Sequence, residues 1–229
     1  MNQAQLFVVA TPIGNLDDIT FRAIETLKRC PIIACEDTRV SAKLLKKFNI
    51  TATLVPYHDK NERLQTKYLI QKIKTGIPIA LICDAGTPTI SDPGFCIVRE
   101  CKKNRIDVIP IPGASALMAA LSASGLPTHR FLFLGFPGHR ESERIKILEK
   151  YSTMDVTLGF YESCHRIEKF LNNIFDTYGP NRFISLCKEL TKIHEILLTA
   201  PISDVLSMAK KIALKGEFVV LIAPPNYSL

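Results

Sequence analysis

The sequence lacks the long apolar runs of a membrane protein. No stretch approaches the roughly 18 consecutive apolar residues that a membrane-spanning helix needs. The first short apolar run has no basic segment ahead of it, so it lacks the form of a secretory signal. We therefore expect a cytoplasmic protein. The 229 residues are 47% hydrophobic and 22% charged, which is ordinary for a globular chain of one large or two small domains.

Paired cysteines are also missing. The seven cysteines form an odd set without any C-x-x-C pair, which argues against a disulfide framework or a thiolate metal site. The five histidines show no metal-ligand spacing either. We expect no metal, and reduced cysteines that act as small apolar side chains: Cys30, Cys35, Cys83, Cys96, Cys101, Cys164 and Cys187.

Several familiar motifs are absent. There is no G-x-G-x-x-G, which disfavours a nicotinamide dinucleotide site, and no G-x-x-x-x-G-K-[ST], which disfavours a P-loop. The segment "PGASA" carries Ser115 but lacks the second glycine of a nucleophile elbow. Acidic residues are fewer than basic ones, 22 against 29, and the net charge of +7 moderately favours a polyanionic partner.

What the first half does contain is a regular alternation of strand and helix patterns. Segment 59–75 predicts a crossover helix whose apolar face carries Leu64, Tyr68, Leu69 and Ile73. Around it, short apolar runs rich in Val and Ile predict strands at 6–10, 32–35, 53–56, 79–83 and 106–111. This pattern predicts an α/β fold with a mostly parallel, doubly wound sheet.

The pattern changes near "SASGLPTHRF", where Gly125 and Pro127 favour a domain boundary. We expect domains over 1–124 and 125–229. The second half predicts helices at 139–151, 164–178 and 202–214, and strands at 130–136, 155–161, 183–187, 194–198 and 217–223. The short gap between 183–187 and 194–198 implies antiparallel pairing, and so a mixed-sheet α/β domain.

Loops rich in Gly, Pro and Asp follow each strand of the first half, where open parallel sheets bind their ligands. The loop in "LICDAGTPTISDPG" (81–94) is the most elaborate. Gly86 permits a positive φ or a close ligand approach, Pro88 and Pro93 stiffen the chain, and Asp84 can attract a cation. Gly113 opens a site where free N–H groups could hold a carboxylate. Together these loops suit a zwitterionic ligand with a cationic centre.

The chain resembles a known family in many blocks that occur in the family's order. They include "VVATPIGNLDDIT" (8–20), "EDTR" (36–39), "YHDKNE" (57–62), "LICDAGTPTISDPG", "IPGASAL" (111–117), "SGLPTHRF" (124–131), "FYESCHR" (160–166), "KELTK" (188–192) and "KGEFVVLI" (215–222). With these blocks it closely resembles the tetrapyrrole methylase superfamily, the class III S-adenosylmethionine-dependent methyltransferases. Within that superfamily it is most similar to the members that methylate ribosomal RNA. The resemblance covers nearly all of 6–223.

The resemblance implies two α/β domains with S-adenosylmethionine in the cleft between them, and a homodimer. It also implies transfer of a methyl group to the ribose 2′-OH of a cytidine in the decoding region of 16S rRNA, within the small ribosomal subunit. By motif position, it assigns cofactor binding to Pro12, Gly14, Asp84, Ala85, Gly86, Thr87, Pro88, Gly113, Ala114, Ser115, Tyr161, Lys188 and Gly216.

Methyl transfer to a hydroxyl needs alignment of oxygen, methyl and sulfur, and removal of a proton. The candidates for a base or an orienting group are Glu36, Asp37, Arg39, Glu162 and Glu189. Each carboxylate also fits a structural role paired with a neighbouring cation. The expected RNA contacts are Arg39, His58, Arg63, Arg130, Arg140 and Arg166, with Lys43 and Lys60 fitting a solvated surface equally well.

Three positions depart from the family pattern. Ala114 stands where proline is common, Lys188 stands where arginine is common, and Cys164 stands where proline or threonine is frequent. Lysine keeps the charge of arginine but loses its bidentate fork. Many members also continue into a further C-terminal helical segment, which we expect to be absent or replaced here.

Two alternatives remain open. A sister enzyme of the same fold would methylate a carbon of a porphyrinoid precursor. The "EDTR", "FYES" and "KELTK" motifs and the basic charge argue against it. A non-catalytic protein would keep the fold only to bind cofactor or ribosome, but the largely intact cofactor loops disfavour this.

Overall fold

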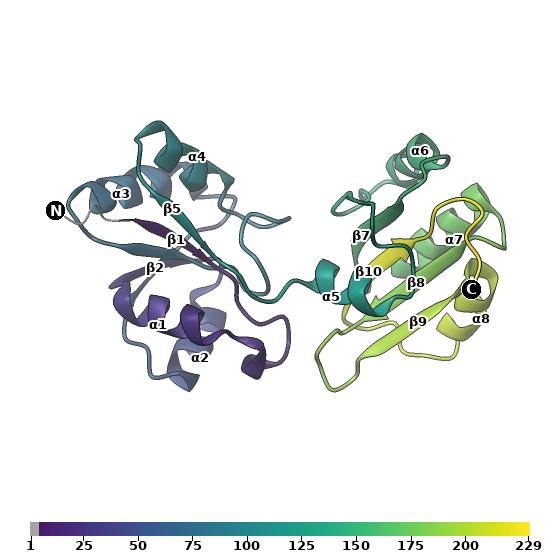
Figure 1. Cartoon of the computed structure of the whole chain (residues 1–229), viewed down its shortest axis with the longest axis horizontal. Coiled ribbons are helices and arrows are strands. Elements are labelled where there is room, and N and C mark those ends of the chain that lie inside the picture. Colours follow the sequence, from purple (N-terminus) through teal and green to yellow (C-terminus); the bar gives the residue numbers. More distant parts are fainter. Residues whose placement is uncertain (1–4) are drawn as a thin grey trace. The chain divides into compact units, whose positions relative to one another are not determined.

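The computed structural model describes residues 5–229. The chain divides into two compact units, the first ending at Ser115 and the second beginning at Ala116. This division precedes helix α5 (Ala116–Ala123), whereas the sequence suggested a boundary after it, at 124/125. Leu117 of α5 packs against Gly159 of the second unit, leaving no room there for even a Cβ. α5 therefore belongs with the second unit (Figure 1).

The first unit is a doubly wound α/β domain, as the sequence predicted. Its five parallel strands run in the order β3-β2-β4-β1-β5. They are β1 (Leu6–Val9), β2 (Ile32–Cys35), β3 (Thr53–Pro56), β4 (Ile79–Leu81) and β5 (Val108–Ile111). The helices are α1 (Phe21–Arg29), α2 (Thr38–Lys47), α3 (Glu62–Lys74) and α4 (Phe95–Lys103), with a short 3₁₀ turn at Leu16–Asp18.

Alternate strand residues of the first unit face opposite helix layers, because side chains of a strand alternate between its two faces. Leu6 of β1 packs in the cluster that contains α3 and α4, and Val9 packs in the cluster that contains α1 and α2. Figure 1 shows these two helix pairs on opposite sides of the sheet. Both faces are therefore buried, which explains the continuous apolar runs of the strands.

The chain leaves neighbouring strands β1 and β4 toward opposite faces of this sheet. β1 leads into α1 on one face, and β4 leads into α4 on the other. Such a switch point opens a crevice at the carboxyl ends of the strands, where open α/β sheets bind ligands.

The second unit has the expected mixed sheet. Strand order is β6-β7-β10-β8-β9, with only β6 and β7 parallel. The strands are β6 (Phe131–Phe133), β7 (Thr157–Ser163), β8 (Phe183–Lys188), β9 (Ile196–Pro201) and β10 (Glu217–Ile222). Helices α6 (Glu141–Tyr151), α7 (Ile167–Tyr178) and α8 (Ile202–Ala209) contribute to one core on the sheet, in which the rings of Phe160 and Phe170 meet edge to face.

Two details differ from the sequence prediction. α8 ends at Ala209 instead of 214, because its last turn tightens into bonds three residues apart, from Lys211 N–H to Met208. In α3, Leu69 and Ile73 are buried as expected, but Leu64 is 72% and Tyr68 is 41% exposed.

Candidate functional site

The loops after β1 and β4 are joined by backbone at the switch point. Thr11 N–H donates to Gly86 O at 2.8 Å, and Gly86 N–H donates to Thr11 O at 3.0 Å. The Thr11 hydroxyl also donates to the carbonyl of Cys83 at 3.0 Å. These hydrogen bonds join the two loops into one surface beyond the ends of their strands, which we call the ledge.

A third loop, the one after β5, joins this ledge. The Thr87 hydroxyl donates to the carbonyl of Ala114 at 3.2 Å. Gly86 has φ +86°, and a Cβ placed there would touch the Ile13 side chain at 3.4 Å. The structure thus gathers the cofactor-binding residues expected in the first unit. Pro12, Gly86 and Pro88 are buried; Asp84, Thr87, Ala114 and Ser115 are half-buried; Gly14, Ala85 and Gly113 are exposed.

Left-handed backbone is concentrated in the loop between β4 and α4. Thr89 and Ser91 have φ of 75° and 65°, a region that side chains other than glycine rarely occupy. Gly94 has φ +140°, and a Cβ there would lie 2.7 Å from the Thr89 methyl group. Strain of this kind persists only where the surrounding structure enforces it, and it clusters at ligand sites.

Carboxylates gather at the same edge of the sheet. Burial, and then the nearby charge of Asp84, raise the pKa of Glu36. Burial and then Glu36 raise the pKa of Asp92 to about 6, with smaller contributions from Asp84 and Asp59. Burial also raises the pKa of Asp84, whose Oδ1 accepts the Asp37 N–H at 3.0 Å. The resulting negative potential suits a cationic ligand.

Asp37 and Arg39 of the "EDTR" motif form an ion pair with each other. Asp37 caps α2, accepting the Arg39 backbone N–H at 2.8 Å, and also receives the Arg39 guanidinium through Nε at 3.0 Å and Nη2 at 2.6 Å. These bonds lower the pKa of Asp37 to about 2. Arg39 itself is highly exposed. Asp37 is thus a poor base, whereas the outer face of Arg39 remains open to solvent.

The "YHDKNE" loop has a structural task. The Glu62 Oε1 accepts the N–H groups of Gly94 and Cys96, at 3.0 and 3.1 Å, and the hydroxyl of Tyr57 at 3.1 Å. It therefore ties this loop to the first turn of α4. His58 is half-buried and Arg63 is exposed.

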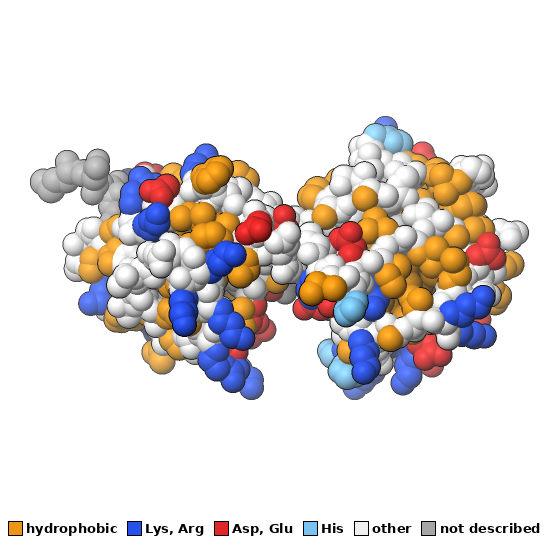
Figure 2. All heavy atoms as spheres, turned by 90° about the horizontal axis from the view of Figure 1, so that it is seen from below, with side chains coloured by type: hydrophobic (Ala, Val, Ile, Leu, Met, Phe, Trp, Pro, Cys, Tyr) orange, Lys and Arg blue, Asp and Glu red, His pale blue; other side chains and the backbone are white. Residues whose placement is uncertain are grey.

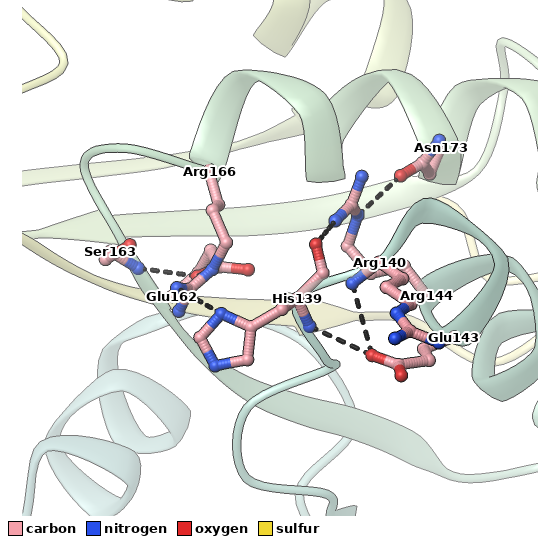
Figure 3. Close-up of polar contacts among 8 residues, drawn as sticks. All are labelled: His139, Arg140, Glu143, Arg144, Glu162, Ser163, Arg166 and Asn173. Atoms are coloured by element: carbon pink, nitrogen blue, oxygen red, sulfur yellow. Dashed lines mark hydrogen bonds and ion pairs between the residues drawn. The ribbon is translucent and has the colours of Figure 1, made fainter.

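In the second unit, a buried ion pair follows β7. Glu162 is 2% exposed, and its Oε1 accepts Arg166 Nε at 2.9 Å and the Ser163 N–H at 2.8 Å. Arg166 continues to His139 Nδ1 at 3.2 Å (Figure 3). Glu162 Oε2 and the Ser163 hydroxyl are buried without a hydrogen-bond partner in the described part of the chain. Buried carboxylate oxygens without a protein partner are uncommon in folded proteins.

The remaining predicted residues of this unit lie on its strands, next to them or at the start of α6. Tyr161 packs edge to face on Phe133, with ring centroids 4.8 Å apart. Arg130 and Arg140 are both exposed. Lys188 is only 6% exposed at the end of β8, and no carboxylate of residues 5–229 forms an ion pair with it.

Glu189 is held between β8 and β10. It has φ 50°, and its Oε1 accepts Lys192 Nζ and the Glu217 N–H, both at 2.9 Å. Burial opposes ionisation of Glu189, but these hydrogen bonds outweigh it and keep its pKa below the ordinary value. A Cβ at Gly216 would overlap the Glu189 carboxyl group. Glu189 and Gly216 thus form a structural lock, which disfavours Glu189 as a base.

Sequence reasoning missed or undervalued several residues. Asp92 was expected only to shape its turn, yet it joins the carboxylate group, and Thr11 forms the ledge without having been singled out. Only their positions after β1 and β4 could have indicated them. Arg144 is buried among neutral partners, and its position inside the charged helix gave no signal.

Neither a metal site nor a membrane span emerges from the described residues. Within 5–229, no group of three or more His, Cys, Asp or Glu is placed to hold a metal ion. No helix in that range has the length and apolar character needed to cross a bilayer. All seven cysteines are free thiols, five of them buried.

The chain is similar to known proteins over most of its length. The family model of tetrapyrrole (corrin/porphyrin) methylases matches residues 5–206. Ribosomal RNA small subunit methyltransferase I of Halalkalibacterium halodurans is 46% identical over 221 residues, covering 96% of this chain and 76% of that protein. The protein of the same name from Escherichia coli O157:H7 is 43% identical over 223 residues, covering 96% and 78%.

The fold is likewise shared with a solved structure. Cobalt precorrin-4 methyltransferase, a cobalamin biosynthetic enzyme, matches with a TM-score of 0.70 over 96% of this chain and 94% of its own, at 14% identity. That likeness concerns the fold alone. Because the family model and the curated relatives each cover most of the sequence, the chain belongs to the tetrapyrrole methylase family.

Proposed function

We propose that this protein transfers a methyl group from S-adenosylmethionine to the ribose 2′-OH of a cytidine in the decoding region of 16S rRNA. The observation that carries the proposal is the 43–46% identity, over 96% of the chain, to proteins named ribosomal RNA small subunit methyltransferase I. The +7 net charge supports an RNA substrate.

The ledge at the carboxyl edge of the first unit fits S-adenosylmethionine. Backbone groups of Pro12, Gly14, 84–88 and 113–115 would hold the cofactor, and Asp84 with its neighbouring carboxylates would favour its positive charge. From the second unit, we assign Tyr161, Lys188 and Gly216 to the same cofactor by motif position. When bound, the cofactor supplies an electrophilic methyl group on a sulfonium.

Among the candidate bases, the structure favours Glu36. Asp37 is tied to Arg39, Glu162 to Arg166, and Glu189 to Lys192. Glu36 forms no ion pair with any of residues 5–229, and burial followed by the charge of Asp84 raises its pKa above the ordinary value. A base works best when its pKa approaches the working pH. In this scheme Glu36 accepts the ribose hydroxyl proton while the oxygen takes the methyl group.

The deciding experiment incubates purified protein and labelled S-adenosylmethionine with one of two substrates, either small subunits that lack the methylation or a porphyrinoid precursor. Label on the subunits is then mapped by nuclease digestion. Label on one cytidine ribose is the expected result. Label on a porphyrinoid precursor would transfer the assignment to the sister activity, and no label on either substrate would favour a non-catalytic binding protein. Glu36→Gln should cut the methylation rate at least tenfold, and this loss should exceed the smaller drop in cofactor affinity caused by removing one nearby negative charge.

The proposal also covers the oligomeric state and the cellular location of the protein. The family membership of the chain supports a homodimer, and a ribosomal substrate would place the protein in the cytoplasm. Sedimentation at micromolar concentration should give twice the mass of one 25.6 kDa chain. A single-chain mass would overturn the dimer without affecting the proposed reaction.

A further inference from the structure

A cavity of about 440 Å³ lies between α6 and α7 of the second unit. Its lining includes the cationic side chains Arg144, Arg166 and Lys169, together with His139 and Asn172. The volume falls in the range of small-molecule sites. No residue of the proposed cofactor set lines it.

Arg144 is a buried cation without a carboxylate partner. It is 3% exposed, its Nε donates to Asn173 Oδ1 at 2.8 Å, and its Nη1 donates to the His139 carbonyl at 2.9 Å (Figure 3). Both acceptors are neutral. Among residues 5–229, no carboxylate lies within ion-pair distance of Arg144, and its Nη2 has no hydrogen-bond partner but keeps some solvent exposure. A buried unpaired charge is costly unless an anion accompanies it.

Hydrogen bonds within the chain fix the wall of the cavity beside Arg144. Glu143 accepts the backbone N–H groups of His139 and Arg140, both at 3.1 Å, and so fixes the turn that enters α6. Gly138 has φ +113°, and a Cβ there would lie 2.8 Å from the Glu143 carboxyl oxygen. The His139 carbonyl that orients Arg144 is therefore rigidly placed.

Of the cationic side chains around the cavity, Arg144 and Lys169 have no ion-pair partner among residues 5–229 and can therefore meet an anion. Arg166 is already neutralised by Glu162. Of the two carboxylates in the lining, Glu141 accepts the Asn173 amide at 3.1 Å, and Asp176 pairs with no cation of residues 5–229. Lys169 is exposed at the rim, where a long flexible ammonium can meet an incoming anion.

We propose that this α6–α7 cavity binds a phosphodiester group of the RNA substrate, with Arg144 as the buried anchor and Lys169 at its rim. The proposal rests on the proposed function, because it takes RNA as the substrate. The shared chemistry is a phosphate oxyanion, and an RNA backbone and free phosphate are its two possible sources. Guanidinium groups prefer such oxyanions because their donors match the geometry.

Two variants test the site against one control. Lys169→Gln removes the rim charge from an exposed position, and Arg144→Lys keeps the buried charge but loses the fork. Lys146→Gln removes one exposed lysine of α6 outside the cavity. Circular dichroism verifies the fold of each variant, and Lys169→Gln keeps the test valid if Arg144→Lys does not fold.

The first measurement is binding of a small-subunit RNA fragment across a salt series. Lys169→Gln should weaken binding about three- to tenfold and reduce the salt slope by about one phosphate contact, and Arg144→Lys should weaken it at least as much. Lys146→Gln should bind like the wild type. Wild-type affinity in both cavity variants, or an equal loss in the control, would overturn the proposal.

The second measurement separates the two phosphate sources and the two levels of the proposal. Inorganic phosphate is titrated while the Arg144 Nε–H resonance is followed by NMR, with chloride at equal ionic strength as reference. A phosphate-specific shift without any RNA effect would assign the cavity to free phosphate and overturn the RNA claim.

Subunit methylation is assayed in parallel: Lys169→Gln should raise KM for RNA and leave kcat unchanged. A wild type that binds RNA through the cavity but methylates nothing would refute only the proposed function.

Discussion

At the scale of the residue, Asp92 is the side chain whose environment differs most from its expected role. Its position before Pro93 indicated a simple turn cap. Instead, burial and the neighbouring Glu36 raise its pKa to about 6. A carboxyl group whose pKa is raised on folding binds its proton more tightly in the folded state, so it destabilises the fold once it ionises.

Asp92→Asn should therefore stabilise the first unit at high pH. Relative to the wild type, the gain should be about 1–2 kcal/mol at pH 7.5, allowing for partial exposure, and should shrink as the pH falls through 6 toward 4. Urea unfolding followed by circular dichroism at pH 4 and 7.5 measures it. The control is Asp107→Asn, which removes an exposed carboxylate of the same unit. An equal gain at both pH values would contradict the assignment to ionisation.

Substitution of Arg39 tests whether this residue contacts RNA or only stabilises Asp37. Its guanidinium already neutralises Asp37, yet the side chain is exposed. Arg39→Ala should reduce methylation of small subunits about tenfold while leaving S-adenosylmethionine affinity within twofold, because an RNA contact would be lost. Lys43→Ala, an exposed position on the same helix, should have a smaller effect. Unchanged methylation in Arg39→Ala would exclude the residue from RNA binding.

At the scale of the element, helix α4 begins on a distant side chain. Its N-cap position is Gly94, which offers no side-chain cap, and Glu62 from the start of α3 accepts its first N–H groups. Burial disfavours the Glu62 carboxylate, but these hydrogen bonds prevail and keep its pKa below the ordinary value. The motif "YHDKNE" thus stabilises the loop that precedes α4.

Glu62→Gln should destabilise the first unit by about 1–2 kcal/mol at pH 7, since a charge-assisted cap is replaced by a neutral one. Because the pKa of Glu62 is depressed on folding, the wild-type advantage exists above the unfolded pKa and disappears as the pH falls below about 4. Glu168→Gln, in the first turn of α7, controls for the helix dipole. A deficit that persists undiminished at low pH would argue against the cap.

The contact of Glu189 between β8 and β10 requires that residue 216 has no Cβ. Gly216→Ala would place its Cβ on the Glu189 carboxyl group at φ +100°, whereas Gly179→Ala at φ +79° meets no atom within 4 Å. Both should lose about 1–2 kcal/mol to backbone strain. Gly216→Ala should lose about 1–3 kcal/mol more to overpacking, measured as unfolding free energy. Equal losses would show that Glu189 moves aside freely.

Elements were more predictable than their contacts. Apolar runs located every strand, and the doubly wound and mixed sheets followed from their spacing. Periodicity failed at Leu64, because the buried face of α3 runs through Thr66, Leu69, Ile70 and Ile73. The Glu62 cap and the Thr11–Gly86 bridge join segments 32 or more residues apart, and no local pattern encodes such pairings.

At the scale of the whole molecule, charge is distributed unevenly enough to matter. The chain carries a net +7, yet carboxylates gather at the edge of the first sheet that we assign to the cofactor. Figure 2 shows Lys and Arg side chains over the face of the first unit that carries α1 and α2. The last turns of these two helices are basic and contain Lys28 and Arg29 in α1 and Lys46 and Lys47 in α2.

The proposed substrate and cofactor should therefore respond differently to salt. If three or more phosphates are contacted, RNA affinity should fall about tenfold or more between 50 and 200 mM salt. S-adenosylmethionine affinity should change less than twofold, since its contacts lie at partly buried groups. Filter binding and calorimetry provide the two measurements. RNA binding that is independent of salt would contradict a phosphate-dominated interface.

The Thr11–Gly86 bridge has a consequence for any mutational survey of this protein. In the proposed cofactor site, the ledge would present main-chain amides and carbonyls to the ligand, and its shape depends on backbone bonds and positive φ angles. Alanine substitution of residues other than glycine leaves the main-chain amides and carbonyls in place, so much of the wall that we assign to the cofactor would score as tolerant. Replacing single amides with esters, which deletes one N–H at a time, would reveal a binding surface that side-chain genetics cannot detect.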